Sequence, residues 1–283
     1  MARTPSHVRV AALVLAPFAW LAPLAAQQPL TPDDWGQWER LGRGVMSPDG
    51  SWLAVSIARV NEENELRIRP VADPDSVVVV PYGGGPEFSS DGRWLAYSIG
   101  MSDEEREELQ ERNEPARADL GLLDLGTGEV EEVEDVSSYA FSADGAYLAM
   151  RRFAPDGERE ATGVDLIVRD LARGTDLNFG NVAEYAWQDG DDAPARLALL
   201  IDARDMAGNG VQLYEASEGR IRTLDAASAR YSELRWREDA ADLALLRTVP
   251  DDAEGEEAWA DTARVMLAFT DVSRPDVAPR VFD

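Results

Sequence analysis

The feature that most constrains this chain is a ten-residue stretch that recurs along it, seen most clearly as FSSDGRWLAY at residues 88–97. Its Asp-Gly pair supplies the positive φ of a tight hairpin turn, because glycine adopts that conformation at no steric cost. After the turn the residues alternate, so Trp94 and Ala96 share one face of a strand while Leu95 and Tyr97 share the other. Both faces are apolar. The stretch therefore predicts a β-hairpin that must be covered on both sides.

The same pattern returns as MSPDGSWLAV at residues 46–55 and as FSADGAYLAM at residues 141–150. Two weaker copies begin at Trp187 and Trp236. The copies follow one another with a period of roughly 40 to 50 residues, which is typical of one blade of a propeller. The chain is therefore predicted to be a repeat protein whose unit contains a β-hairpin.

Two further strand-like runs follow each hairpin, such as residues 120–125 and 130–133 in the second copy. Four antiparallel strands per repeat is the construction of a propeller blade. We therefore expect an all-β fold, a β-propeller of four-stranded antiparallel blades with about five blades present and truncated in mid-repeat. The expected segments are a signal peptide over 1–26, a lead-in over 27–44 and the propeller over 45–283, with blades near 45–82, 83–135, 136–181, 182–228 and 229–283.

The long connections between strands are all of one kind, because each links the second strand of a repeat to the third. They span residues 100–118, 152–163, 202–210 and 248–262. Successive turns of a meander alternate between its two ends, so these loops should all emerge at the same end. Loops on a rigid scaffold often carry function. The first loop contains the capping-box pattern Ser102-x-x-Glu105, which predicts a short helical insertion.

The first 26 residues are typical of a secretory signal peptide. They begin with positive charge at Arg3 and Arg9, continue through an apolar run over 10–24, and end on the small residues Ala25 and Ala26. An uncleaved anchor is the less favoured alternative, because prolines interrupt the run and no stop-transfer charges follow it. We therefore expect a secreted or periplasmic protein that has no membrane contact after cleavage.

The lead-in segment begins with TPDDWGQWE at residues 31–39. Thr31 is a suitable N-cap, and Trp35, Trp38 and Leu41 recur at helical spacing. These residues predict a short helix that packs against the edge of the repeat array.

The composition excludes several kinds of chemistry. The chain has a formal charge of −27, which makes nucleic acid an improbable partner because phosphates would be repelled. It contains no lysine and no cysteine, and its single histidine, His7, lies in the leader. A Ser-His-Asp triad, a Cys-His pair, a Ser-Lys dyad and a zinc site each need one of these residues. No Gly-x-Ser-x-Gly elbow is present. We expect no catalytic residues, no metal and no cofactor.

Carboxylates remain, and two groups of them have alternative interpretations. Glu184 and Glu233 each stand three residues before a repeat tryptophan, so they could form the carboxylate pair of a glycosidase. The favoured interpretation is that they line a wet channel mouth. Asp189, Asp191 and Asp192 could hold calcium, but they lack the spacing of an EF-hand loop, which favours a solvated turn.

The repeats at residues 46–55, 88–97 and 141–150 resemble the WD-like propeller repeats of two groups of proteins. These are the periplasmic propeller protein of the Tol system and the secreted serine peptidases of the prolyl oligopeptidase family. The lead-in TPDDWGQWE followed directly by the first Ser-Pro-Asp-Gly looks like the start of the peptidase group. That resemblance implies a propeller of seven or eight blades preceding an α/β-hydrolase domain that holds the catalytic serine, aspartate and histidine.

In this chain the hydrolase half and the remaining blades are missing, so the resemblance carries over no catalytic residue. In the dipeptidyl-peptidase branch, a pair of glutamates on a propeller insertion binds the free amine of the substrate. Glu104-Glu105 and Glu107-Glu108 are the candidates for that pair. The residues around them do not match the branch, so the role is not transferred and the substrate-binding residues stay unknown.

These observations lead to three functional hypotheses. The first is the propeller of a secreted prolyl-oligopeptidase-type serine peptidase, inactive alone, which gates or orients peptides for a missing α/β-hydrolase domain. The second is a non-enzymatic, Tol-like periplasmic propeller that binds a protein or peptide. The third is a five-bladed glycosidase that uses Glu184 and Glu233. In the first two, the partner is expected to bind at the end that carries the long loops.

Overall fold

The computed structural model describes residue 31 and residues 38–155, 163–190, 193–204, 206–249 and 264–283. The leader and most of the lead-in lie outside these residues. Within the described ranges the regular structure is almost entirely β-strand, interrupted by the helix α2 (Asp103–Glu111) and the 3₁₀ turn η1 (Ala216–Glu218). No described helix is both long and apolar enough to cross a bilayer.

The strands are β1 (Glu39–Met46), β2 (Trp52–Arg59), β3 (Glu65–Pro70), β4 (Val78–Pro81), β5 (Gly83–Phe88), β6 (Trp94–Ile99), β7 (Asp119–Asp124), β8 (Val130–Val133), β9 (Val136–Phe141), β10 (Tyr147–Arg152), β11 (Val164–Asp170), β12 (Thr175–Trp187), β13 (Arg196–Ile201), β14 (Gly210–Glu215), β15 (Arg220–Ala226), β16 (Arg230–Trp236), β17 (Leu243–Thr248), β18 (Arg264–Phe269) and β19 (Arg280–Phe282). Each repeat hairpin and the two strand-like runs after it are present as predicted.

The strands pair in the order in which they occur along the chain, and every pairing is antiparallel. Strands β1–β4, β5–β8 and β16–β19 form three four-stranded sheets, and β9–β15 form one sheet of seven strands. Pairing of sequential neighbours needs only local connections, so this order is the simplest one for a chain of hairpins. The all-β prediction, with four-stranded antiparallel sheets, is confirmed.

Strand β12 is the reason that seven strands form one sheet. Its first part pairs with β11 and its second part with β13, and both ladders shift register near Val182. Asn181, just before the shift, has a left-handed backbone with φ of 56°. An irregularity of this kind bends a strand and increases its twist. Strand β12 is therefore the last strand of one four-stranded unit, β9–β12, and the first strand of the next, β12–β15.

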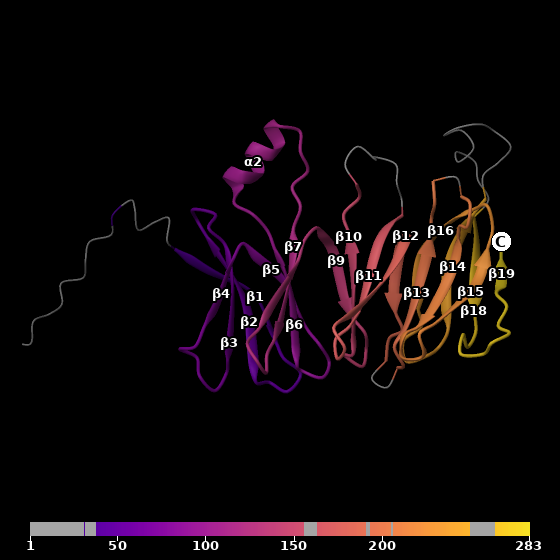
Figure 1. Ribbon diagram of the computed structural model, residues 1–283, viewed down its shortest axis with the longest axis horizontal. Helices are drawn as coiled ribbons and strands as arrows, with labels where there is room; N and C mark the ends of the chain where they lie inside the picture. The colour runs from indigo at the N-terminus through magenta and orange to yellow at the C-terminus, as the bar shows by residue number, and fades with distance from the viewer. Residues whose placement is uncertain (1–30, 32–37, 156–162, 191–192, 205, 250–263) are drawn as a thin grey trace, which may run out of the picture.

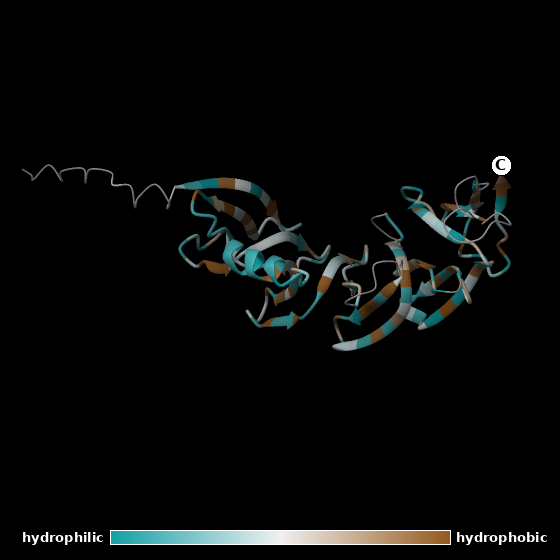
Figure 2. Cartoon of the chain, turned by 90° about the horizontal axis from the view of Figure 1, so that it is seen from above, coloured by the Kyte–Doolittle hydropathy of each residue, from teal (hydrophilic) through white to brown (hydrophobic). Residues whose placement is uncertain are grey.

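The sheets stand side by side and follow one another in chain order (Figure 1). Seen from above, the succession follows a curve, with the first sheet at one end and the last sheet at the other (Figure 2). Neighbouring four-stranded units face each other, and hydrophobic clusters fill the space between them.

These clusters show why both faces of the central strands are apolar. On β6, Leu95 and Tyr97 pack with the buried residues of the first sheet, including Leu66. Ala96, on the opposite face, packs with β7, β9 and β10 residues such as Leu148. Leu95, Ala96, Leu66 and Leu148 have no exposed surface, and burying one leucine side chain contributes about 1.5–3 kcal/mol. The predicted hairpin with two apolar faces is confirmed.

The repeat turn is held by a fixed set of hydrogen bonds. Ser89 Oγ donates to Asp91 Oδ1 at 2.5 Å, and the same carboxylate oxygen accepts the backbone N–H of Arg93 at 3.0 Å. The backbone N–H of Trp94 donates to Ser89 Oγ at 2.9 Å. The same three bonds occur in the turns at residues 47–52 and 142–147. The Ser-x-Asp-Gly pattern is thus a hydrogen-bonded unit that closes each hairpin.

The weaker copies use tryptophan to join neighbouring units. Trp187 Nε1 donates to the backbone oxygen of Ala140 at 3.0 Å, and Trp236 Nε1 donates to that of Ala186 at 2.9 Å. Each indole therefore reaches back to the first strand of the preceding unit while its ring packs against the core. The hydrogen-bonding requirement of a buried indole N–H is met in this way.

The predicted lead-in helix is wrong in its described part. Residues from Glu39 onward form β1, and Leu41 pairs with Ile57 of β2. Gly42 contributes to this outcome, because glycine disfavours helix and a Cβ at this position would lie 3.1 Å from the backbone oxygen of Ser56. The first sheet therefore begins before residue 45. The other expected segment limits stay predictions.

Candidate functional site

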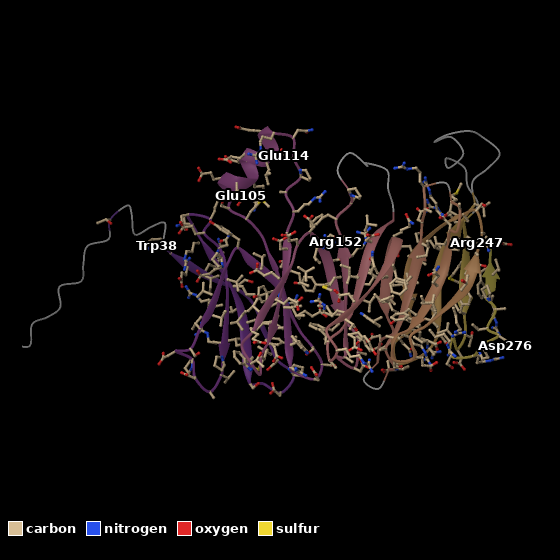
Figure 3. All side chains as sticks on the ribbon, viewed as in Figure 1. Trp38, Glu105, Glu114, Arg152, Arg247 and Asp276 are labelled. Carbon is tan, nitrogen blue, oxygen red and sulfur yellow. The ribbon has the colours of Figure 1, made fainter. Side chains whose placement is uncertain are left out.

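The long connections gather at one end of the array, which we call the loop end. Helix α2 stands there, between β6 and β7, and the strands that border the other long connections have their ends on the same side (Figure 1). Figure 3 places Glu105 and Glu114 at this end and Arg152 and Arg247 toward it, whereas Asp276 lies at the opposite end. For the described strand ends, the predicted asymmetry of the loops is confirmed.

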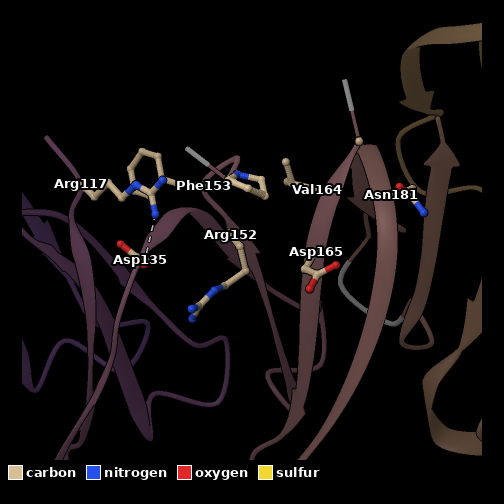
Figure 4. Close-up of a pocket in the computed structure, with 9 residues that line it drawn as sticks. Arg117, Asp135, Arg152, Phe153, Val164, Asp165 and Asn181 are labelled. Carbon is tan, nitrogen blue, oxygen red and sulfur yellow. Dashed lines mark hydrogen bonds and ion pairs between the residues drawn. The ribbon is translucent and has the colours of Figure 1, made fainter. Parts of the chain in front are cut away.

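A pocket of about 350 Å³ opens at the loop end, between the second sheet and the β9–β12 unit (Figure 4). Its walls come from residues that are far apart in the sequence but meet at the corners of neighbouring strands. The polar and aromatic residues that line it are Arg117, Asp135, Arg152, Phe153, Asp165 and Asn181. The pocket is thus built at or next to strand ends and at the irregular point of β12, which hold its side chains in place.

Arg117 forms a fixed wall of the pocket. Its Nη1 donates to Asp135 Oδ2 at 3.3 Å, and its Nη2 donates to the backbone oxygen of Ala154 at 2.9 Å. Asp135 is itself held in place, because it occupies a left-handed turn with φ of 55° and its backbone N–H donates to Asp119 Oδ1 at 2.9 Å. The guanidinium of Arg117 is therefore anchored on both sides.

Arg152 lies between the two walls (Figure 4). It is half-buried, and its Nη1 donates to the backbone oxygen of Glu134 at 2.6 Å. Among the described residues, no carboxylate forms an ion pair with it. Asp165, on the β11 side, accepts a hydrogen bond from Asn178 Nδ2 at 3.3 Å. The pocket therefore places a guanidinium between two carboxylate-bearing walls.

Gly163 allows the rim of the pocket to close tightly. A Cβ at this position would lie 2.4 Å from the backbone oxygen of Asn181 and 2.5 Å from that of Asp202. Those distances are shorter than any side chain tolerates, so the start of β11 can approach β12 this closely only with glycine.

The arginines of this pocket can bind an anionic group. Guanidinium groups are fixed forks of N–H donors that suit carboxylate or phosphate oxygens. None of the pocket side chains is a nucleophile with an adjacent base. In the described part of the chain, no cluster of histidine, cysteine, aspartate or glutamate is arranged to hold a metal ion.

No protein-family model matches this sequence, and no curated protein sequence matches it either. The chain is similar to solved β-propeller structures. The β-propeller domain of the trilobed protease from Pyrococcus furiosus shares 13% identity over 87% of this chain and 71% of its own length, with a TM-score of 0.47.

TolB from Acinetobacter baumannii matches at 13% identity over 82% of this chain, with a TM-score of 0.38. An acylaminoacyl peptidase from Pyrococcus horikoshii matches at 14% identity over 82% of this chain, with a TM-score of 0.42. The chain spans 52% of the length of the first of these and 39% of the second. A Tol protein and peptidases are also the two groups that the repeat motif resembles.

Glu184 and Glu233, the carboxylates of the glycosidase hypothesis, lie in adjacent units but serve different purposes. Glu184 Oε1 accepts the backbone N–H of Glu233 at 3.1 Å, and its Oε2 accepts that of Leu234 at 3.0 Å. The Glu233 side chain is exposed and pairs with Arg235. The Glu184 side chain therefore connects β12 to β16 through two hydrogen bonds.

The remaining acidic candidates that the structure describes are found on the surface. Asp189 is in a described turn, where its Oδ1 accepts the backbone N–H of Gly190 at 2.9 Å, and Asp191 and Asp192 lie outside the described residues. Ser102 Oγ caps α2 by accepting the backbone N–H of Glu105 at 3.1 Å, as predicted. The glutamates of α2 that were candidates for binding a free amine are exposed to solvent, and they are Glu104, Glu105, Glu107 and Glu108.

Sequence reasoning did not single out Arg117 and Arg152. A signal for both was present, because each stands at the border of a long connection, over residues 100–118 and 152–163. A search for cations at the two borders of the long connections would have found them. Their proximity depends on the packing of one sheet against the next, which the repeat pattern does not specify residue by residue.

Proposed function

We propose that this chain is the front β-propeller portion, about five blades, of a secreted serine peptidase of the prolyl oligopeptidase type. The observation that carries the proposal is the gathering of the long connections and an arginine-lined pocket at one end of a repeat array whose sequence contains no histidine, lysine or cysteine. The lead-in at residues 31–39, which looks like the start of that peptidase group, favours it over the Tol-like alternative. In the intact enzyme, the loop end would receive and orient peptides.

The chain by itself is expected to be inactive. Acyl transfer from a peptide needs a nucleophile activated by a base, and the sequence offers no lysine, no cysteine and no histidine beyond His7 of the leader. A separate α/β-hydrolase domain would supply the serine, the aspartate and the histidine. The propeller would then contribute binding and access, which raise the effective concentration of a correctly oriented peptide.

The decisive experiment starts from the gene region that follows the codon of Asp283. We expect an open reading frame that continues and encodes a Gly-x-Ser-x-Gly elbow, and we expect the intact product to react with a fluorophosphonate serine probe. Substitution of the elbow serine by alanine should abolish labelling, and the present chain should remain unlabelled. A stop codon directly after Asp283 would instead support the Tol-like interaction propeller.

The glycosidase alternative is tested with Glu184→Gln and a panel of arabinan and xylan substrates. Both oxygens of Glu184 are engaged by backbone N–H groups of β16, which argues against a role as acid or nucleophile. Hydrolysis by the parent chain, lost in this variant, would revive the alternative. Absence of hydrolysis by the parent chain ends it.

Secretion is tested by expressing the chain with its first 26 residues in a Gram-negative host. The expected result is a periplasmic product whose amino-terminal sequence starts at Gln27, because Ala25 and Ala26 provide small residues before the cut. A cytoplasmic or membrane-bound product that keeps its leader would contradict the proposal.

A further inference from the structure

We propose that the pocket between Arg117 and Arg152 binds a peptide carboxylate, with Arg152 as the group that contacts it. The inference rests on the proposed function in one respect, the choice of a peptide as the ligand. It gives the loop end a defined ligand chemistry, namely an acidic peptide group held by a guanidinium fork.

The charge and the hydrogen bonding of Arg152 support the proposal. Its guanidinium carries five N–H donors, and one of its nitrogens donates to the backbone oxygen of Glu134. The side chain is half-buried without an ion-pair partner among the described residues. A partly buried charge that lacks a counterion gains free energy when an anion arrives, because the anion restores the solvation that burial removed.

The rigidity of the surroundings also supports the proposal. Arg117 is anchored by Asp135 and by the backbone oxygen of Ala154, so this wall of the pocket is held at a fixed position. Phe153 and Val164 also line the pocket and offer apolar surface to the aliphatic part of a ligand (Figure 4). A preformed pocket with a few placed polar groups and apolar walls is the usual form of a small-ligand site.

The size and charge of the pocket select the class of ligand. A volume of about 350 Å³ accommodates the end of a peptide or one acidic residue with its neighbours. Asp135 and Asp165 line the same space, and together they oppose a doubly charged phosphate more than a singly charged carboxylate. In a chain of formal charge −27, the two arginines of the pocket balance its two aspartates, so an anion meets less repulsion here than the overall charge implies.

The test is calorimetric titration of the purified chain with three acetylated peptides. Ac-Ala-Ala-Ala carries a free terminal carboxylate, Ac-Ala-Glu-Ala-amide carries one on a side chain, and Ac-Ala-Ala-Ala-amide carries none. We expect at least one acidic peptide to bind about tenfold more tightly than the neutral one. The two acidic probes distinguish a terminal from a side-chain carboxylate. Equal affinity for all three, or no binding, would overturn the inference.

Variants assign the effect to the pocket. Arg152→Gln should weaken binding of the preferred peptide about tenfold, and Arg152→Lys should weaken it less, because lysine keeps the charge but loses the fork. Arg274→Gln is the matched control, since Arg274 is exposed and pairs with Asp276 at the opposite end (Figure 3). Full affinity of Arg152→Gln would contradict the proposal.

If Arg152→Gln fails to fold, the comparison of the three peptides on the unmodified chain still tests the proposal, because that comparison needs no substitution. The two proposals also fail separately. Peptide binding is measured on this chain, whereas the proposed function is tested by serine labelling of the intact product. If the chain binds acidic peptides but its intact product is never labelled, the pocket proposal stands and the proposed peptidase function is refuted.

Discussion

Replacement of Gly145 by alanine tests whether the hairpin turns of neighbouring units press against each other. Gly145 has φ of 69°, and a Cβ placed on it would lie 3.0 Å from Ser90 Oγ and 3.1 Å from the backbone nitrogen of Asp91. Both atoms belong to the turn of the preceding sheet. The serine side chain can rotate away, but the backbone nitrogen can move only with the whole turn.

The magnitude follows from a comparison with Gly174, in the same β9–β12 unit. Gly174 has φ of 62°, and a Cβ added there would have no atom within 4 Å, so alanine meets only the conformational cost of positive φ, about 1 kcal/mol. Alanine at Gly145 meets a similar conformational cost and also overpacks the contact with the neighbouring turn, which typically costs about 1–3 kcal/mol. Gly145→Ala should therefore be the more destabilising variant by about 1–3 kcal/mol.

The assay is urea unfolding followed by tryptophan fluorescence, with equal slopes required before midpoints are converted to free energies. Repeat arrays can unfold in parts, so circular dichroism should report the same transition. Ser90→Ala combined with Gly145→Ala should recover part of the loss, because it removes the contact with the serine hydroxyl. Equal destabilisation by Gly145→Ala and Gly174→Ala would refute the stacking of turns.

Three further predictions concern interfaces and pH. Glu184→Ala leaves two backbone N–H groups of β16 without their acceptor and should cost about 1–3 kcal/mol in urea unfolding, while Glu233→Ala, at an exposed side chain, should change little. Hydrogen bonds from Ser47 and, second, from Ser51 lower the pKa of Asp49 to about 2. The folded pKa of Asp49 lies below the ordinary 3.8, so the stabilisation by its carboxylate is complete above about pH 4 and is lost as the pH falls toward 2. Asp49→Asn should remove this pH dependence of stability. Parallel curves of stability against pH for the two proteins would contradict the prediction. Met266 in the last described sheet is 40% exposed, so the chain should self-associate as its concentration rises. Met266→Glu should reduce this association in light scattering, and a monodisperse parent chain would refute the expectation.

The local structure of this fold can be predicted from the sequence. The alternation of Leu95 and Ala96 predicts a strand buried on both sides, and the clusters on the two faces of β6 bear this out. The Ser-x-Asp-Gly pattern around Asp91 predicts the turn, because its hydrogen bonds join residues at most five apart. The lengths of the connections predict which end carries the loops. Each of these features depends on near neighbours in the chain.

Contacts between units were decided by the tertiary structure. Leu41 lies at helical spacing from Trp38, yet it joins a strand because β2 offers a pairing partner. Glu184 ties β12 to β16 across 50 residues of sequence, and Arg117 and Arg152 meet at one pocket although they belong to different sheets. A repeat motif specifies that neighbouring sheets must bury apolar faces. Which polar side chains then meet at their corners depends on the register and angle of that packing, and these arise only when the sheets come together.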